Sequence, residues 1–292
     1  MQHTFSIILP TYNNLEELKK CIKSLEKLHL QDFEVIISVD GSTDETVDFL
    51  NTNNFVFACK TLISIENKGR SSARNLGIKE ATGKYILLLD SDMEADVNLL
   101  SEHLKVMENE SVVSQGFVQY PENDDFGQYA MGRGKGKFDH NVILEKKYLN
   151  TGNVAMPTKL AKLVLFDEAS SYGEDLLWAF DLDKVVNYQL INNRKAISNS
   201  ASNVSLEKAM SRYFILGKEF IPLAIKKHPA AEKIFEVHKY SNWIYKLIAN
   251  QLFFYLARKS YQFFPQKIRL LFIHYLLFCN LKRGIDCVSN LK

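Results

Sequence analysis

The chain has 292 residues, of which 46% are hydrophobic and 24% are charged. This composition excludes a predominantly disordered protein, and the length allows one large domain with an appendage. The formal net charge of +2 is unevenly distributed, because 15 Lys and Arg stand against 5 Asp and Glu after Ser205. An acidic front and a basic tail favour an anionic partner surface for the tail, and we expect no nucleic-acid partner.

The N-terminus and the cysteines both indicate a reducing compartment. Met1 leads directly into an apolar run, without the charged start, long apolar stretch and cleavage site of an export signal. We therefore expect the catalytic part to face the cytoplasm. No C-x-x-C pair occurs, so the cysteines are expected to be reduced, buried thiols: Cys21, Cys59, Cys279 and Cys287.

The first hundred residues alternate short apolar runs with amphipathic helical patterns. Residues 5–9 predict a buried strand that Pro10 stops, and leucines at helical spacing follow it. Asn14, with Glu17 three residues later, predicts a capping-box-like start for that helix. The next expected elements are a strand over 33–39, a helix starting at 42–45, a strand over 61–65, a helix through 74–81 and a strand over 85–89. Apolar strands separated by helices predict an α/β fold with a mostly parallel sheet covered on both faces.

After Leu100 the alternation loosens. Residues 112–120 predict one more strand, and a polar segment follows. Within it, residues 131–137 read Met-Gly-Arg-Gly-Lys-Gly-Lys, three glycines interleaved with cations. This basic loop could close over a diphosphate, and the alternative is a solvated surface loop.

Polar residues stand where each of the first four strands ends. Ligands of parallel sheets bind beyond the carboxyl ends of the strands. Any one of these segments alone is typical of turns, but four in one half-chain are more than turn chemistry needs. The segments are Thr11-Tyr12-Asn13, Asp40-Gly41-Ser42, Asn67-Lys68-Gly69 and Asp90-Ser91-Asp92.

The last of these segments predicts a metal site. Asp90 and Asp92 directly follow an apolar strand, where negative charge is costly unless a positive group neutralises it. Two carboxylates one residue apart supply hard oxygen ligands for Mg²⁺ or Mn²⁺, with water and phosphate oxygens completing the shell. A metal bound there would offset the charge on a leaving diphosphate.

Two later motifs carry candidate acceptor and base residues. Glu174 and Asp175 precede an apolar helical run, so they either stabilise the helix start or supply a general base. Residues 150–153 form a small-residue turn with amide donors suited to a sugar hydroxyl, and the alternative is a simple strand-entry turn.

Together these motifs resemble those of a family 2 glycosyltransferase with the GT-A fold, in both order and spacing, over roughly residues 5–205. The resemblance rests on Pro10-Thr11-Tyr12-Asn13, Asp40-Gly41-Ser42-Thr43-Asp44, Asn67-Lys68-Gly69, Ala73-Arg74-Asn75, Asp90-Ser91-Asp92, Thr151-Gly152-Asn153, Phe166-Asp167-Glu168 and Gly173-Glu174-Asp175.

The resemblance implies transfer from a nucleotide-diphosphate sugar, with a UDP-sugar favoured, to a hydroxyl of a glycan or lipid-linked acceptor. Transfer would invert the anomeric carbon and serve the synthesis of a cell-surface polysaccharide or glycolipid. Asp175 would be the catalytic base with Glu174 beside it, and Asp92 and Asp90 would bind Mn²⁺ or Mg²⁺. The implied nucleotide-sugar site comprises Pro10, Thr11, Tyr12, Asn13, Asp40, Asn67, Gly69, Arg74, Asp90 and Ser91, and the implied acceptor site comprises Thr151, Gly152, Asn153 and Glu174.

One departure concerns the metal. Members of the family often place a histidine after the base-bearing helix, but residues 198–205 contain none. The nearest later histidines, His228 and His238, lie in another helical segment. We therefore expect the metal to depend on the aspartates and the diphosphate alone, or to bind more weakly.

Two rival functions remain from other classes. A sugar nucleotidyltransferase usually opens with a long Gly-rich phosphate loop, whereas this chain has Thr-Tyr-Asn-Asn at that place. A non-catalytic sugar-binding or scaffold protein could retain the fold, although Asp92 and Asp175 are both present. Slow hydrolysis of UDP-sugars would separate an enzyme from a scaffold.

The tail predicts a different environment. We expect a GT-A domain over residues 1–205 and a basic, aromatic-rich helical extension over 206–292. Its apolar clusters, around 243–245, 252–256 and 268–278, are interrupted by cations and Pro265, so no run reaches the ~20 residues needed to span a bilayer. The pattern predicts peripheral contact with the inner face of an anionic membrane. The alternative is packing on the catalytic domain or on a second copy in a homo-oligomer.

Overall fold

A computed structural model describes residues 3–107, 109–133, 139–170, 172–201, 204–235 and 251–289. The chain divides into two compact units, one made of residues 1–120 with 133–202 and the other of residues 121–132 with 203–292. The second unit thus includes a segment from the middle of the chain, which the expected division at residue 205 did not anticipate. Each unit is described by itself.

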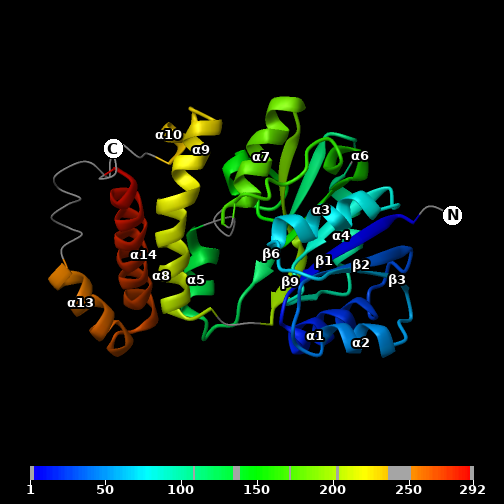
Figure 1. The fold of residues 1–292 in the computed structure, drawn as a ribbon, viewed down its shortest axis with the longest axis horizontal. Helices are drawn as coiled ribbons and strands as arrows, with labels where there is room; N and C mark the ends of the chain where they lie inside the picture. Colours follow the sequence, from blue (N-terminus) through cyan, green and yellow to red (C-terminus); the bar gives the residue numbers. More distant parts are fainter. Residues whose placement is uncertain are drawn as a thin grey trace. The chain divides into compact units, whose positions relative to one another are not determined.

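The first unit contains the predicted alternation of strands and helices (Figure 1). Its elements are β1 (Phe5–Thr11), α1 (Leu15–Leu25), β2 (Phe33–Asp40), α2 (Thr46–Thr52), β3 (Ala58–Ser64), α3 (Arg70–Glu80), β4 (Tyr85–Leu89), β5 (Met93–Ala95), α4 (Leu99–Val106), β6 (Val112–Gln119), β7 (Val142–Leu144), the 3₁₀ turn η2 (Lys146–Tyr148), β8 (Asn153–Pro157), α6 (Thr158–Ala161), α7 (Glu174–Val185) and β9 (Gln189–Ser200).

The strands form one mixed sheet, which confirms the predicted α/β class. In the described residues its order is β3-β2-β1-β4-β8-β6-β9-β5, and β7 also pairs with β9. The first four strands are parallel, as predicted, because a helix follows each of β1, β2 and β3 and returns the chain to the same edge. The other half is mixed: β8 runs antiparallel to β4 and β6, whereas β6 and β9 are parallel.

Helices cover both faces of this sheet, as the continuous apolar strands predicted. Alternate residues of β1 point to opposite faces: Phe5, Ile7 and Leu9 pack with residues of α1, α2 and α4, whereas Ile8 packs with residues of α3, α6 and α7. Figure 1 shows α1 and α2 on one side of β1, β2 and β3, and α3 on the other. This burial leaves the loops at the strand ends to carry polar groups.

The second unit is helical in its described residues, so the predicted helical C-terminal region is present. Its elements are α5 (Asp125–Arg133), α8 (Leu206–Ile215), the π-helical turn η3 (Leu216–Phe220), α9 (Ile221–Lys227), α10 (Ala231–Ile234), α13 (Gln251–Ser260), the 3₁₀ turn η4 (Tyr261–Phe263) and α14 (Gln266–Ser289). In the described part of the chain, no helix is both long enough and apolar enough to cross a membrane.

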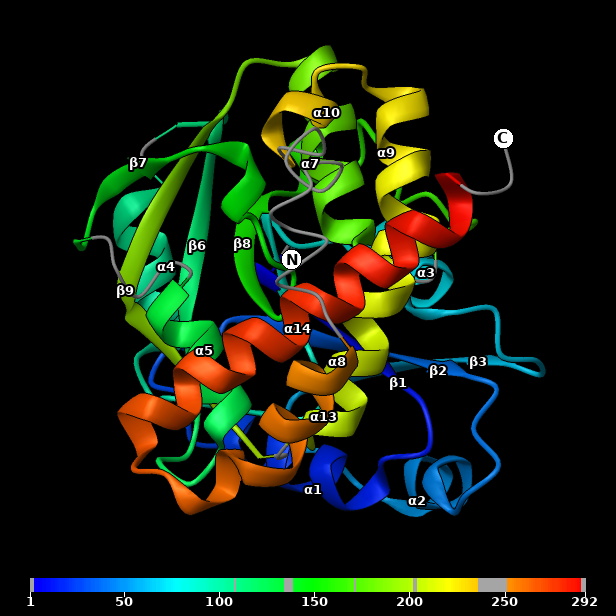
Figure 2. The same cartoon turned by 90° about the vertical axis from the view of Figure 1, so that its left-hand side faces the viewer.

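Helix α14 contacts most of the other helices of this unit. It runs along α8, and Figure 2 shows α5 beside it as well. Two contacts fix α5: the Arg269 Nε to Asp125 Oδ2 ion pair of 2.9 Å, and the 2.9 Å hydrogen bond between the Tyr129 hydroxyl and His274 Nδ1. These long-range contacts explain why residues 121–132 belong with the C-terminal helices. The predicted aromatic cluster at 243–245 lies outside the described residues.

Candidate active site

Loops from the carboxyl ends of β1 and β2 are bonded to one another. The Asn13 side-chain oxygen accepts hydrogen bonds from the backbone amides of Thr43, at 2.7 Å, and Asp44, at 3.3 Å. Asn13 has a φ of 47°, in the left-handed region that asparagine tolerates better than most residues. Two segments that the sequence placed at strand ends therefore form one continuous surface.

Asp40 holds the loop that follows β3. Its two carboxylate oxygens accept hydrogen bonds from the backbone amides of Lys68 and Gly69, each 2.8 Å long. The neighbouring Gly41 has a φ of 68°, and a Cβ there would lie 2.4 Å from the backbone nitrogen of Asn67. Only glycine permits this approach, so Asp40 and Gly41 together bring the Asn67 loop against the end of β2.

Asn14 departs from its predicted function. It precedes α1, but its side chain makes no capping hydrogen bond, so the predicted capping box is wrong. Its amide instead donates to the Ser91 hydroxyl at 2.8 Å, and Ser91 donates to the carbonyl of Pro10 at 2.8 Å. The Thr11 hydroxyl donates to the Asn14 side-chain oxygen. A contact 77 residues away thus ties the end of β1 to the aspartate loop after β4.

Arg74 links two of the predicted site segments. Its guanidinium is 2% exposed and donates to Asp90 Oδ1 at 2.7 Å and to Glu174 Oε1 at 2.9 Å. Burial disfavours the charged form, but the two carboxylates outweigh it and raise the pKa of Arg74. Arg70 lies 3.5 Å from the same Glu174 oxygen. Arg74 therefore acts as a fixed positive charge between the aspartate loop and the start of α7.

Glu174 and Asp175 are adjacent but have different surroundings. Glu174 is buried and paired with the two arginines, whereas Asp175 is half-buried. Burial and the negative charge of Glu174 raise the pKa of Asp175 to about 7, against the opposing effect of the arginines and of the Leu176 amide. The N-cap residue of α7 is Gly173, and no side chain makes a capping hydrogen bond at this position. A carboxyl group with such a pKa is suited to accept a proton near neutral pH.

The turn before β8 is fixed to two strands. Gln115 of β6 donates to the carbonyls of Asn150, at 3.0 Å, and Asn153, at 2.8 Å, and its side-chain oxygen accepts from the Asn150 amide at 2.8 Å. The carbonyl of Gly152 accepts from the Asp90 amide at 3.2 Å. Thr151 and Asn153 are buried. The turn is thus a rigid neighbour of Asp90.

A buried histidine, His103, is hydrogen-bonded to Asn153 at the end of this turn. The side-chain amide of Asn153 donates to the carbonyl of Ala196 and to the Ser198 hydroxyl, so its oxygen must accept from His103 Nε2, 2.8 Å away. His103 Nδ1 then accepts from the Ser114 hydroxyl, also at 2.8 Å. This assigns the neutral tautomer with the proton on Nε2. Burial lowers the pKa of His103 to about 4, despite the bond to Asn153.

We expect His103→Phe to destabilise the protein by about 1–3 kcal/mol, because it leaves Asn153 and Ser114 with unsatisfied buried groups. Urea unfolding at pH 7 measures this, with His29→Phe at an exposed histidine as the control. The folded pKa of about 4 lies below the ordinary 6.5, so the unfolded chain binds more protons between these values. Stability should therefore fall as pH is lowered through this window, and His103→Gln should reduce that slope. An unchanged slope would contradict the assignment.

The loop of Asp90 and Asp92 supplies two carboxylates, which is fewer ligands than a metal site made of protein side chains alone would need. In the described ranges, no group of three or more His, Cys, Asp or Glu side chains could hold a metal by itself. Asp90 Oδ1 pairs with Arg74. Asp90 Oδ2 lies next to Gly152, where an added Cβ would be only 3.3 Å from it. Asp92 is half-buried beside it. Mg²⁺ sites often use one or two carboxylates and take their remaining ligands from phosphates and water, so these residues fit such an ion.

The structure also shows side-chain contacts that the sequence motifs did not predict. Asn75 donates to the carbonyl of Phe166 at 3.0 Å and to Glu168 at 2.9 Å, which ties the loop before α7 to α3. Like Asn14, Gln115 and His103, it acts through partners distant in sequence. The predicted basic loop lies mostly outside the described residues, which omit 134–138.

A mixed sheet with bonded loops at the carboxyl ends of its parallel strands, and two aspartates after the fourth, defines a GT-A-type nucleotide-binding enzyme fold. The family model described as "Glycosyl transferase family 2" matches residues 6–165. The chain belongs to this family. The match ends before Glu174 and Asp175, so the functional interpretation of these two residues rests on their geometry.

Three similar proteins illustrate the relationship. An uncharacterized glycosyltransferase of Rickettsia bellii is 36% identical over 168 residues, which are 56% of this chain and 23% of that protein. The Escherichia coli UDP-Glc:alpha-D-GlcNAc-diphosphoundecaprenol beta-1,3-glucosyltransferase WfaP is 34% identical over 122 residues, 41% of this chain and 47% of that protein. The chain thus spans about a quarter and about half of the lengths of these two relatives.

The third is a solved structure, which shares the fold. The mannosyltransferase PcManGT from Pyrobaculum calidifontis, solved in complex with GDP-Man and Mn²⁺, aligns with a TM-score of 0.64 at 16% identity. The alignment covers 98% of this chain and 88% of that one.

Proposed function

We propose that the protein transfers a sugar from a nucleotide-diphosphate sugar, a UDP-sugar in the first instance, to a hydroxyl of a glycan or lipid-linked acceptor. The observation that carries this is the Arg74 bridge, which joins Asp90 to Glu174 next to Asp175. It links a carboxylate pair suited to a metal-bound diphosphate with a carboxyl group suited to proton transfer. The name of the WfaP relative, which contains both UDP-Glc and a diphosphoundecaprenol acceptor, supports this donor and acceptor class.

In the proposed reaction, Asp175 takes the proton of the acceptor hydroxyl. The acceptor oxygen then forms a bond to the anomeric carbon, while the bond from that carbon to the diphosphate breaks and the nucleoside diphosphate leaves with the electron pair. Attack opposite the leaving group inverts the anomeric carbon. Glu174 is buried against two arginines, so we propose that it positions Asp175 and Arg74 in addition to lying near the acceptor.

The donor would bind along the edge formed by the strand-end loops. Tyr12 is exposed there, and the Asn67 loop is held beside it by Asp40. Hydrogen bonds through Asn14 connect three further residues, Pro10, Thr11 and Ser91. We propose that these residues shape the donor site. The acceptor would lie over Gly152, with buried Thr151 and Asn153 supporting the turn.

A divalent cation, Mn²⁺ or Mg²⁺, would be held by Asp92 and Asp90 together with the donor diphosphate. When bound, it would supply positive charge that stabilises the leaving diphosphate. The GDP-Man and Mn²⁺ complex of PcManGT supports a metal in this fold.

We further propose that residues 1–205 are the catalytic domain and that 206–292 form an extension that contacts the inner face of the cytoplasmic membrane. Residues 251–289 carry six Lys and Arg but one carboxylate, Asp286. Each cation near an anionic surface contributes about 1 kcal/mol, so the charge supports peripheral binding. A homo-oligomer remains the rival arrangement of the tail.

Incubation with a panel of UDP-sugars and GDP-sugars tests the enzyme function. We expect slow release of the nucleoside diphosphate from one donor, and thermal stabilisation by UDP that increases when Mn²⁺ is added. A ligand present at about 100 times its Kd adds about 2.7 kcal/mol of stability. Stabilisation without any hydrolysis would favour a binding protein, and neither effect with any nucleotide would contradict the proposal.

A further inference from the structure

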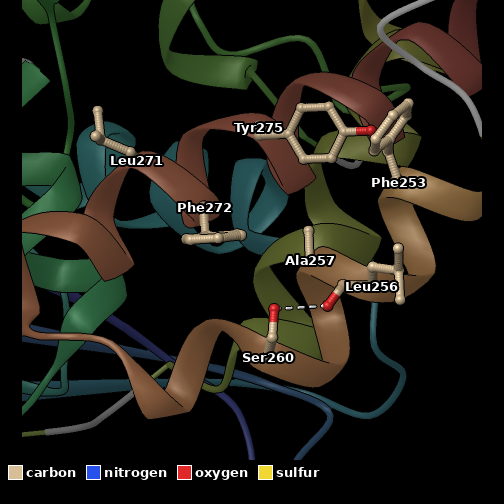
Figure 3. A pocket seen from close by; sticks show the side chains of 7 residues that line it. All are labelled: Phe253, Leu256, Ala257, Ser260, Leu271, Phe272 and Tyr275. Atoms are coloured by element: carbon tan, nitrogen blue, oxygen red, sulfur yellow. Dashed lines mark hydrogen bonds between the residues drawn. The ribbon is translucent and has the colours of Figure 1, made fainter.

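An open groove lies between α13 and α14 in the second unit. It has a volume of about 620 Å³, within the range of about 300–1,000 Å³ typical of small-molecule sites. Figure 3 shows the side chains that line it, which come from both helices. They are Phe253, Leu256, Ala257 and Ser260 of α13, and Leu271, Phe272 and Tyr275 of α14.

The lining selects an apolar ligand. Five of its seven side chains are hydrocarbon, and the two hydroxyls already have partners. Ser260 donates to the carbonyl of Leu256 at 2.7 Å, and the Tyr275 hydroxyl interacts with Cys279. A polar ligand would therefore lose its hydration without gaining hydrogen bonds from these side chains. A hydrocarbon chain makes no hydrogen bonds to water, so it would lose none on entering the groove.

Residues 252–271, from α13 through η4 to the start of α14 and here called the rim, expose large apolar side chains, some of which also line the groove. Phe263, at the turn between the two helices, is 85% exposed, and Leu271 is 69% exposed. Large apolar side chains gathered in this way mark interaction or membrane surfaces. The other exposed members of the rim are Leu252, Phe253, Tyr255, Leu256, Phe264 and Ile268.

Cations accompany this rim. Lys259 and Lys267 are exposed on the same two helices, and Arg258 is exposed with Glu207 3.8 Å away, whereas Arg269 and Lys282 pair with Asp125 and Asp286. An anionic surface complements this arrangement. A second copy docked through the same face would bring cations against cations, which like-charge repulsion opposes.

We propose that the groove binds a hydrocarbon chain of an anionic membrane lipid, while the aromatic rim lies at the headgroup level and the three cations contact the headgroups. This deepens the proposed membrane contact of the extension and rests on it. Anchoring at this point would hold the enzyme at the surface where a lipid-linked acceptor resides.

Titration with octyl, decyl and dodecyl phosphate tests the groove without a bilayer. Each methylene buried in the groove should tighten binding roughly two- to four-fold, so affinity should rise steadily along the series. Leu256→Trp, which fills the groove while keeping the rim apolar, should abolish this dependence on chain length. Equal binding of all three alkyl phosphates, or an unchanged series in Leu256→Trp, would overturn the proposal.

Flotation with vesicles tests the membrane part. Wild-type protein should float with phosphatidylglycerol vesicles and less with phosphatidylcholine vesicles, and Leu271→Ser with Lys267→Glu should reduce binding at least ten-fold. Ile65→Ser is the matched control, because Ile65 is 97% exposed in the first unit. Equal loss in the control, or a dimer in sedimentation that Leu271→Ser dissociates, would contradict the assignment to lipid.

Release of nucleoside diphosphate from UDP-sugars in solution separates this inference from the proposed function. The tail variants should keep the wild-type rate, because none changes a residue of the strand-end loops. Lipid binding without sugar-nucleotide hydrolysis would refute the proposed enzyme function alone, and hydrolysis without lipid binding would refute the groove alone.

Discussion

Asp175→Asn is expected to lower turnover by about 10²–10⁴-fold while donor binding remains near wild type. The asparagine keeps an oxygen that can accept the Leu176 amide, which bonds to Asp175 Oδ1 at 2.9 Å, so the start of α7 should persist. What is lost is the group that takes the acceptor proton. Steady hydrolysis of the preferred UDP-sugar and the thermal shift with UDP measure turnover and binding separately.

Asp183→Asn, an exposed acid on the same helix, is the matched control and should leave turnover unchanged. If Asp175→Asn lowered only the unfolding temperature, the residue would be a structural part of the helix start. The base assignment would then be wrong.

The pH profile gives an independent measure of the same group. A base acts only when deprotonated, so kcat/KM should be constant above the raised pKa of Asp175, about 7, and fall about tenfold per pH unit below it. Glu174 contributes to that rise through its negative charge, while Arg74 and Arg70 oppose it. Glu174→Gln should therefore shift the acid limb to lower pH. A profile without an acid limb near neutrality would contradict this.

Asp92→Asn is expected to reduce turnover by orders of magnitude and to remove the additional stabilisation by UDP that Mn²⁺ confers. The change deletes one of two carboxylates suited to the cation, a loss of several kcal/mol of transition-state stabilisation at ~1.4 kcal/mol per tenfold of rate. Asp90→Asn has a second consequence, because buried Arg74 would lose the negative charge of Asp90, whose Oδ1 lies 2.7 Å away. Asp92 is therefore the cleaner test of the metal.

Glu94→Gln, a half-buried acid two residues further along, is the control for the local charge and should keep the metal response. Isothermal titration of Mn²⁺ in the presence of UDP measures the binding itself. Full activity of Asp92→Asn in the presence of EDTA would exclude the proposed metal site.

The local pattern of side chains was sufficient to predict the parallel half of the first unit's sheet, but not its mixed half. The apolar runs at 5–9, 33–39 and 85–89 are buried strands because each is too continuous for a half-exposed surface and too short for a core helix. Parallel strands joined by helices bring their carboxyl ends to one edge, so the positions of Asp40 and Asp90 near this edge followed from chain order.

Functions that depend on distant partners could not be predicted in this way. Asn14 has the local pattern of a helix cap, but Ser91 binds its side chain. Glu174 and Asp175 are neighbours in sequence, and their environments differ because Glu174 pairs with Arg74 and Arg70, which are distant in sequence. His103 belongs to no sequence motif. Its ring is buried next to Asn153, and this burial lowers its pKa so that it is neutral at pH 7.

The same distinction applies to the tail. Its amino-acid sequence predicted a helical, basic extension with interrupted apolar runs, and its described residues are helical. Only packing decided that α5, from the middle of the chain, joins α14, and that α13 and α14 leave a groove between them. Secondary structure depends on neighbours within a few residues, which the sequence specifies directly. Burial, charge state and surface shape depend on groups brought together by folding, so they were determined only by the tertiary structure.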